Sequence, residues 1–69
     1  MNTHSANGYF LRIEEVMLQT KLSRSSVYKQ MEKRNFPLQV KLTTKLVVWH
    51  SIEIDDWMAS KLNARDTIH

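Results

Sequence analysis

Apolar positions recur at helical spacing in the first half of the chain, and they predict two short helices. Residues 13–20 form the first helix, with Val16 directed inward. The second covers Ser23–Arg34, because Ser23 can accept an amide hydrogen bond as an N-cap and no Gly or Pro follows within it. The connection over residues 20–22 has the length that joins the helices of a helix-turn-helix.

The second helix has only a narrow apolar stripe, formed by Val27 and Met31 one turn apart. Its remaining faces carry hydroxyl groups, an aromatic ring and positive charge. These side chains are Arg24, Ser25, Ser26, Tyr28, Lys29 and Lys33. Such donors suit phosphate oxygens and the acceptor-rich base edges of a major groove. Taken alone, the segment also fits a solvated, lysine-rich amphipathic helix. The rest of the chain is therefore needed to choose between this interpretation and DNA binding.

Beyond Pro37 the apolar positions alternate, which predicts two short strands within Val40–Trp49, joined as a hairpin. The polar side chains of this hairpin are Lys41, Thr43, Thr44 and Lys45. We expect them to lie along a DNA backbone or minor groove, the alternative being an ordinary polar turn. The second strand is apolar on both faces. Either one face packs on the third helix and the other on a partner, or the strand is more buried than a two-stranded wing allows. Our hypothesis is the partner contact, as self-association on DNA through Leu46 and Val48.

A third helix is predicted after Ser51, which is another good N-cap. Its inward stripe is Ile54, Trp57, Met58 and Leu62. We expect residues 1–8 to be a disordered tail, residues 9–63 to form one domain and residues 64–69 to fray. The predicted class is α+β, mainly α: a winged helix-turn-helix with three helices and a two-stranded hairpin wing.

Charge is unevenly distributed along the 69 residues. Between Lys21 and His50 seven Lys and Arg side chains face the single acid Glu32, a net charge of +6, whereas residues 1–20 sum to −1 and residues 51–69 to −2. A basic centre between acidic ends indicates one face that meets a polyanion. Because no signal peptide or membrane-length apolar run is present, we expect a soluble, cytoplasmic protein without membrane contact.

Other chemistry finds little support. Cysteine is absent, which excludes disulfides and thiolate zinc sites. The acidic residues Glu53, Asp55 and Asp56 with His50 do not form a metal site, since carboxylates at a helix start serve the dipole and no second histidine has ligand spacing. No nucleophile, phosphate-binding glycine loop or paired-carboxylate arrangement indicates catalysis. We therefore expect no enzyme activity, cofactor or metal.

Several short motifs, taken in order, resemble the AlpA family of small phage and mobile-element regulators, relatives of excisionases in the broad winged-helix class that includes MerR. The resemblance runs from Phe10 to Met58. It rests on Leu11-Arg12, Glu15-Val16, Leu22 through Tyr28, Phe36-Pro37, Val40-Lys41-Leu42, Val47-Val48-Trp49 and Glu53 through Trp57. Three positions that are usually Gly in the family are Lys21, Asn35 and Thr43. Asn35 tolerates a left-handed backbone cheaply, whereas Lys21 and Thr43 are expected to strain or alter their turns.

The resemblance implies a sequence-specific regulator of a prophage or mobile element that binds double-stranded DNA. In a helix-turn-helix the residues just after the cap enter the groove, so Arg24 is the candidate for a bidentate guanine contact, while Ser26 and Lys33 suit phosphate. Tyr28 either contacts DNA or packs, half-buried, under the wing. One alternative is an excisionase that bends an attachment site beside an integrase. Another is a protein–protein adaptor or anti-repressor.

Overall fold

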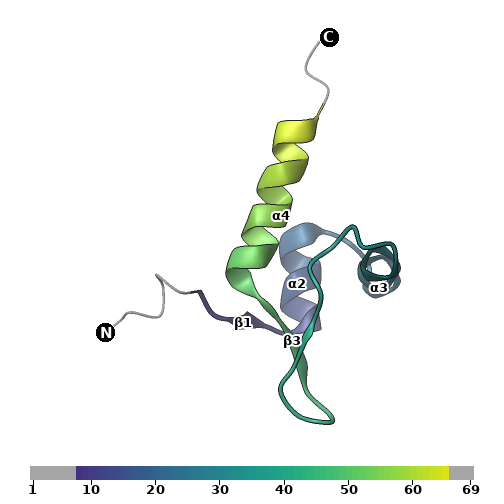
Figure 1. Cartoon of the computed structure of the whole chain (residues 1–69), viewed down its shortest axis with the longest axis vertical. Coiled ribbons are helices and arrows are strands. Elements are labelled where there is room, and N and C mark those ends of the chain that lie inside the picture. The colour runs from purple at the N-terminus through teal and green to yellow at the C-terminus, as the bar shows by residue number, and fades with distance from the viewer. Residues whose placement is uncertain (1–7, 66–69) are drawn as a thin grey trace.

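A computed structural model describes residues 8–65 of the chain (Figure 1). The elements in order are β1 (Phe10–Leu11), α2 (Ile13–Thr20), α3 (Arg24–Glu32), β2 (Val40–Lys41), β3 (Val47–His50) and α4 (Ser51–Ala64). The three strands form an antiparallel sheet in the order β1-β3-β2. The predicted α+β class, with three helices and a wing-like hairpin, is confirmed, and β1 is a strand beyond the predicted two. The expected tails lie almost wholly in residues 1–7 and 66–69, outside the described residues.

The core lies where α2, α3 and α4 meet β3. Its largest fully buried side chain is Trp49, and Leu11, Val16, Val27 and Ile54 are also fully buried. Burying an indole ring is favourable through the hydrophobic effect, but its N–H then needs a hydrogen-bond acceptor within the protein. The indole N–H of Trp49 donates to the carbonyl oxygen of Pro37 at 3.2 Å. The middle strand is therefore anchored to the segment that links α3 to the wing.

The turn between α2 and α3 has the strained backbone that its sequence suggested. Lys21 adopts a left-handed conformation with φ +66°. Its N–H donates to the carbonyl of Met17 at 2.8 Å and closes α2. The hydroxyl of Thr20 donates to the carbonyl of Val16 and accepts from the amide of Leu22. The two helices thus keep their steep turn without a glycine.

The end of α3 corrects the sequence-based expectation. The helix stops at Glu32, and Arg34 rather than Asn35 takes the left-handed conformation, with φ +62°. The backbone N–H of Asn35 donates to the carbonyl oxygen of Gln30 at 2.8 Å. The backbone N–H of Arg34 donates to the carbonyl oxygen of Met31 at 3.0 Å. These two bonds form a Schellman motif, which requires the left-handed residue one position before Asn35.

Ser51 was expected to be the N-cap of the last helix, and this is wrong: the N-cap is His50. The side chain of Ser51 is buried and makes a hydrogen bond outside its own helix. Its hydroxyl oxygen accepts the amide hydrogen of Tyr9 at 2.8 Å, and its own amide donates to the carbonyl of Tyr9 at 2.7 Å. The first strand is therefore tied directly to the start of α4.

The middle strand β3 is buried on both faces, since the adjacent residues Val48 and Trp49 point to opposite faces and are both buried. Leu11 pairs with Trp49 on one side of β3, and Val40 pairs with Val48 on the other. Val48 is only 3% exposed within the single chain. The expectation that Val48 contacts a second copy is therefore wrong for the folded domain, and Leu46 is half-buried.

The last helix extends beyond the rest of the domain, toward the top of Figure 1. The predicted inward stripe is correct at Ile54, which is fully buried, and at Trp57 and Met58, which pack against the core. It is wrong at Leu62, whose side chain is 60% exposed. Helical periodicity places Leu62 on that side, but the described domain offers no element to cover it there.

Candidate nucleic-acid interface

The outer face of α3 carries the charges predicted to meet DNA. Val27 is fully buried and Met31 packs against the core, so these two positions fix which side of the helix is turned inward. Ser25, Lys29 and Lys33 follow one another at intervals of four residues on the opposite side, and all three are exposed. This arrangement gives α3 a continuous polar and basic outer surface.

Arg24 lies at the start of α3 and contacts the first turn of α2. Its guanidinium Nη2 is 3.4 Å from Oε2 of Glu14. Both side chains remain largely exposed, at 56% and 68%. An exposed ion pair of this kind contributes little to stability, so Arg24 can exchange Glu14 for another acceptor at small cost.

Three serine hydroxyls gather at the start of α3. The amide of Ser26 donates to Oγ of Ser23 at 3.1 Å, which confirms the predicted N-cap. The Ser23 hydroxyl in turn donates to Oγ of Ser26 at 3.0 Å. Ser25 lies within 3.3 Å of the same Ser23 oxygen but remains exposed. Ser26 is half-buried and belongs to the cap, whereas Ser25 faces outward.

Tyr28 packs on the core as well as bordering the surface. Its ring meets the ring of Trp49 edge to face, with centroids 6.1 Å apart and an interplanar angle of 71°. The side chain is half-buried. This packing matches the structural alternative given for Tyr28 in the sequence, and it fixes the ring position on that side of α3.

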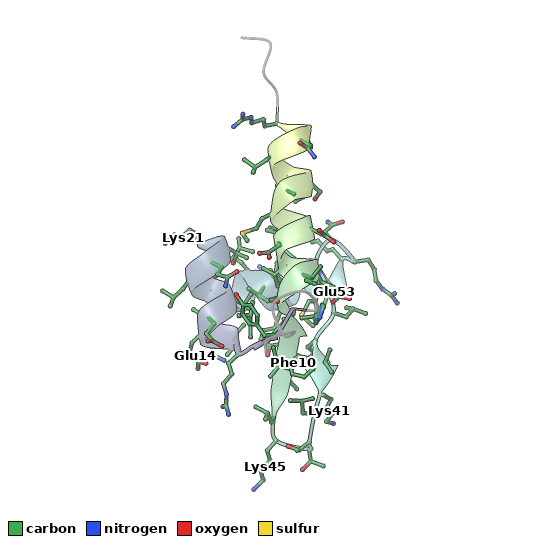
Figure 2. All side chains as sticks on the ribbon, turned by 90° about the vertical axis from the view of Figure 1, so that its left-hand side faces the viewer. Phe10, Glu14, Lys21, Lys41, Lys45 and Glu53 are labelled. Atoms are coloured by element: carbon green, nitrogen blue, oxygen red, sulfur yellow. The ribbon has the colours of Figure 1, made fainter. Side chains whose placement is uncertain are left out.

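The hairpin places its polar residues at an exposed tip. Figure 2 shows Lys45 at the lower end of the hairpin and Lys41 farther up on β2. The turn runs through residues 42–46, so Lys45 lies in the turn and not in a strand. Thr43 needs no left-handed backbone, because its hydroxyl oxygen accepts the amides of Lys45 at 3.2 Å and Leu46 at 3.0 Å. Thr44 is exposed beside it.

Within the part of the chain that the structure describes, Arg24 is the one basic side chain of these two surfaces that forms a salt bridge. Among residues 8–65 the ion pair between Arg24 and Glu14 is the one salt bridge. Lys29, Lys33 and Lys45 therefore keep their charge available to solvent or to a ligand. In the same part of the chain no three His, Cys, Asp or Glu side chains form a group able to hold a metal ion, and no helix is long and apolar enough to cross a bilayer.

Comparison with known proteins places this arrangement in a family. The family described as "Prophage CP4-57 regulatory protein (AlpA)" matches residues 9–62, which include every strand and helix of the described residues except the last two residues of α4. The chain belongs to the AlpA family. It is also 45% identical over 56 residues to "Uncharacterized protein ORF88" of Enterobacteria phage P4. The match covers 81% of this chain and 64% of that relative, and no solved structure matches significantly.

AlpA membership confirms the resemblance found in the sequence. The candidate interface also includes two residues that the sequence analysis did not single out as site residues, Glu14 and Arg34. The contact of Glu14 with Arg24 depends on the angle between α2 and α3, which no local pattern encodes. Arg34 is exposed after α3 and adds a further positive charge near Lys33.

Proposed function

We propose that this AlpA-family chain is a sequence-specific regulator that binds double-stranded DNA in its host's cytoplasm and acts without catalysis. In this proposal α3 lies in the major groove and the hairpin lies along the sugar–phosphate backbone. The observation that carries it is the exposed row Ser25, Lys29 and Lys33 on a helix that the core holds only by its opposite side. A rigid helix with donors and positive charge outward is what major-groove recognition requires.

The residues have separate roles in this complex. Arg24 leaves Glu14 and makes a bidentate contact to guanine, since a guanidinium fork matches the two acceptors of that base. Lys29 follows one turn later toward a base or a phosphate. Lys33 and Lys45 contact phosphates, which orient the protein without selecting the sequence. Thr43 and Thr44 bring the wing tip against the backbone.

A fluorescence-anisotropy titration tests the proposal. The wild-type chain is titrated into a labelled duplex from the intergenic DNA upstream of its own gene and into a shuffled duplex, between about 50 and 200 mM salt. We expect preference for the native duplex and a steep linear dependence on the logarithm of salt concentration. Equally weak and salt-independent binding to both would contradict DNA recognition and favour the protein–protein adaptor.

A charge-matched control separates the interface from general electrostatics. Lys29→Ala removes one charge from the outer face of α3, and Lys61→Ala removes one charge from α4. Only the α3 variant should lose most of its affinity. A circular-permutation gel assay on the native duplex then distinguishes a plain regulator from an excisionase, since pronounced bending of the site supports the architectural role.

A further inference from the structure

The projecting end of α4 leaves an apolar surface uncovered. Leu62 is 60% exposed, and Met58 one turn earlier is only half-buried where the helix reaches the core. Together with Thr20 at the end of α2 they line one shallow groove. An exposed leucine beside a half-exposed methionine on a helix that extends past its own domain is a surface suited to a helical partner.

Charges of opposite sign flank this apolar pair. Asp55, Met58, Leu62 and Arg65 follow one another at spacings of three, four and three residues, the spacing at which side chains share one side of a helix. The stripe therefore has an acid at one end, a base at the other and apolar side chains between. Within residues 8–65 neither Asp55 nor Arg65 forms an ion pair.

We propose that this stripe binds the same stripe of a second copy, with the two α4 helices antiparallel. When the helices are centred on each other, Met58 faces Leu62 of the second copy, and Asp55 faces Arg65 of the second copy. Two-fold symmetry repeats each contact, so one surface complements itself. A parallel arrangement would instead place Asp55 against Asp55 and Arg65 against Arg65, which electrostatic repulsion disfavours.

The length of the stripe determines how strong the contact is. Four side chains per helix bury less surface than the interfaces of stable dimers. The pair therefore forms at high protein concentration, or when two copies are held near each other and their effective concentration rises. This surface replaces the one expected on β3, where Val48 is covered by its own chain. The inference does not depend on DNA binding.

Disulfide trapping tests the register directly, because the chain contains no cysteine. Met58→Cys and Leu62→Cys are made separately with tags of different size, and they are mixed under oxidising conditions at high concentration. We expect the mixed dimer to exceed both homodimers. The matched control pair is Asp56→Cys with Ser60→Cys, which has the same spacing but lies away from the stripe. Mixed dimer no greater than the control pair, or a preference for homodimers, would overturn the antiparallel contact.

Carbodiimide cross-linking gives a second readout that keeps both apolar residues. A zero-length carbodiimide cross-linker forms an amide between a carboxylate and an amine that are in contact. Because the guanidinium of Arg65 does not react, Arg65→Lys supplies the amine and Asp55 of the second copy supplies the carboxylate. We expect intermolecular cross-linking in Arg65→Lys. Adding Asp55→Asn abolishes it, whereas adding Asp56→Asn leaves it unchanged. Equal yields in these two double variants would exclude the proposed ion pair.

The sedimentation of charge variants completes the test. Asp55→Arg places like charges opposite each other at both symmetric contacts. The association constant should therefore fall roughly two- to thirtyfold, the range that two exposed ion pairs give. Adding Arg65→Asp exchanges the two charges and should restore association. A loss in the single variant without rescue in the double variant would contradict the register. Thermal unfolding of each variant confirms that the domain itself is intact.

Discussion

The indole N–H of Trp57 donates to the carbonyl oxygen of Asn35 at 2.6 Å, and this bond joins α4 to the segment that leaves α3. The Trp57 ring also meets the ring of Phe36 edge to face, with centroids 4.8 Å apart, and the amine of Lys61 lies 5.4 Å from its centroid. One side chain thus sets the position of the last helix relative to the exit of the proposed recognition helix.

Replacing Trp57 by Phe should cost stability mainly through the lost hydrogen bond. The smaller ring keeps contact with Phe36, but the carbonyl of Asn35 loses its donor, and we expect about 1 kcal/mol of destabilisation. Trp49→Ala should cost about 3 to 5 kcal/mol, because Trp49 is fully buried. Urea unfolding followed by circular dichroism measures both values. A larger loss for Trp57→Phe than for Trp49→Ala would contradict this account of the core.

Glycine at the left-handed turn position should stabilise the domain. Lys21 has φ +66°, a conformation that crowds the Cβ of an L-residue and that glycine adopts freely. We expect Lys21→Gly to raise the free energy of unfolding by about 1 kcal/mol. Lys29→Gly, in the middle of α3, serves as the control and should lower it by about 1 kcal/mol. Similar destabilisation by both substitutions would show that the Lys21 side chain itself stabilises the turn.

Arg24→Ala should reduce sequence preference as well as affinity. If Arg24 reads a guanine, its loss costs roughly 1 to 3 kcal/mol on the native duplex and little on a shuffled one. Glu14→Gln removes the competing carboxylate and should leave the preference intact. Competition titrations with both duplexes measure the ratio of affinities. Equal losses on native and shuffled DNA would make Arg24 a phosphate contact instead.

Lys45→Ala should weaken binding to every duplex alike. A lysine at the wing tip that contacts phosphate releases one counterion on binding, so its removal lowers the slope of log affinity against log salt by about 1. The control is Lys61→Ala on α4, which should leave the slope unchanged. An unaltered slope in Lys45→Ala would remove the wing tip from the interface.

Local patterns predicted most of this fold because local physics decides most of it. The limits of α2, the cap at Ser23 and the inward position of Val27 follow from spacing and side-chain chemistry that neighbouring residues share. The strand β1 has only two residues and could not be predicted from them alone, since its pairing with β3 joins distant parts of the chain. The prediction of Ser51 as an N-cap was wrong for the same reason: its hydroxyl oxygen accepts a hydrogen bond from the amide of a residue 42 positions away in the chain.

The candidate site likewise has features that the sequence predicted and features that only the three-dimensional arrangement reveals. The exposed row on α3 is a property of one helix and was visible in the sequence, as was the polar tip at Thr43. The ion pair of Arg24 with Glu14 and the packing of Tyr28 against Trp49 need the arrangement of several elements. The exposure of Leu62 depends on where the rest of the domain ends, which periodicity within α4 does not reveal.

The paired hydrogen bonds between Tyr9 and Ser51 also bear on how the protein is made. The strand that begins the domain has its partner in β3 and its anchor at the start of α4, so most of the chain must leave the ribosome before that strand can dock. The helices α2 and α3 form earlier from local contacts, whereas closing the sheet waits for distant residues to meet. Folding of this domain is therefore completed only after Ser51 has been synthesised, because a nascent chain stalled before it lacks the hydroxyl and amide that bind Tyr9.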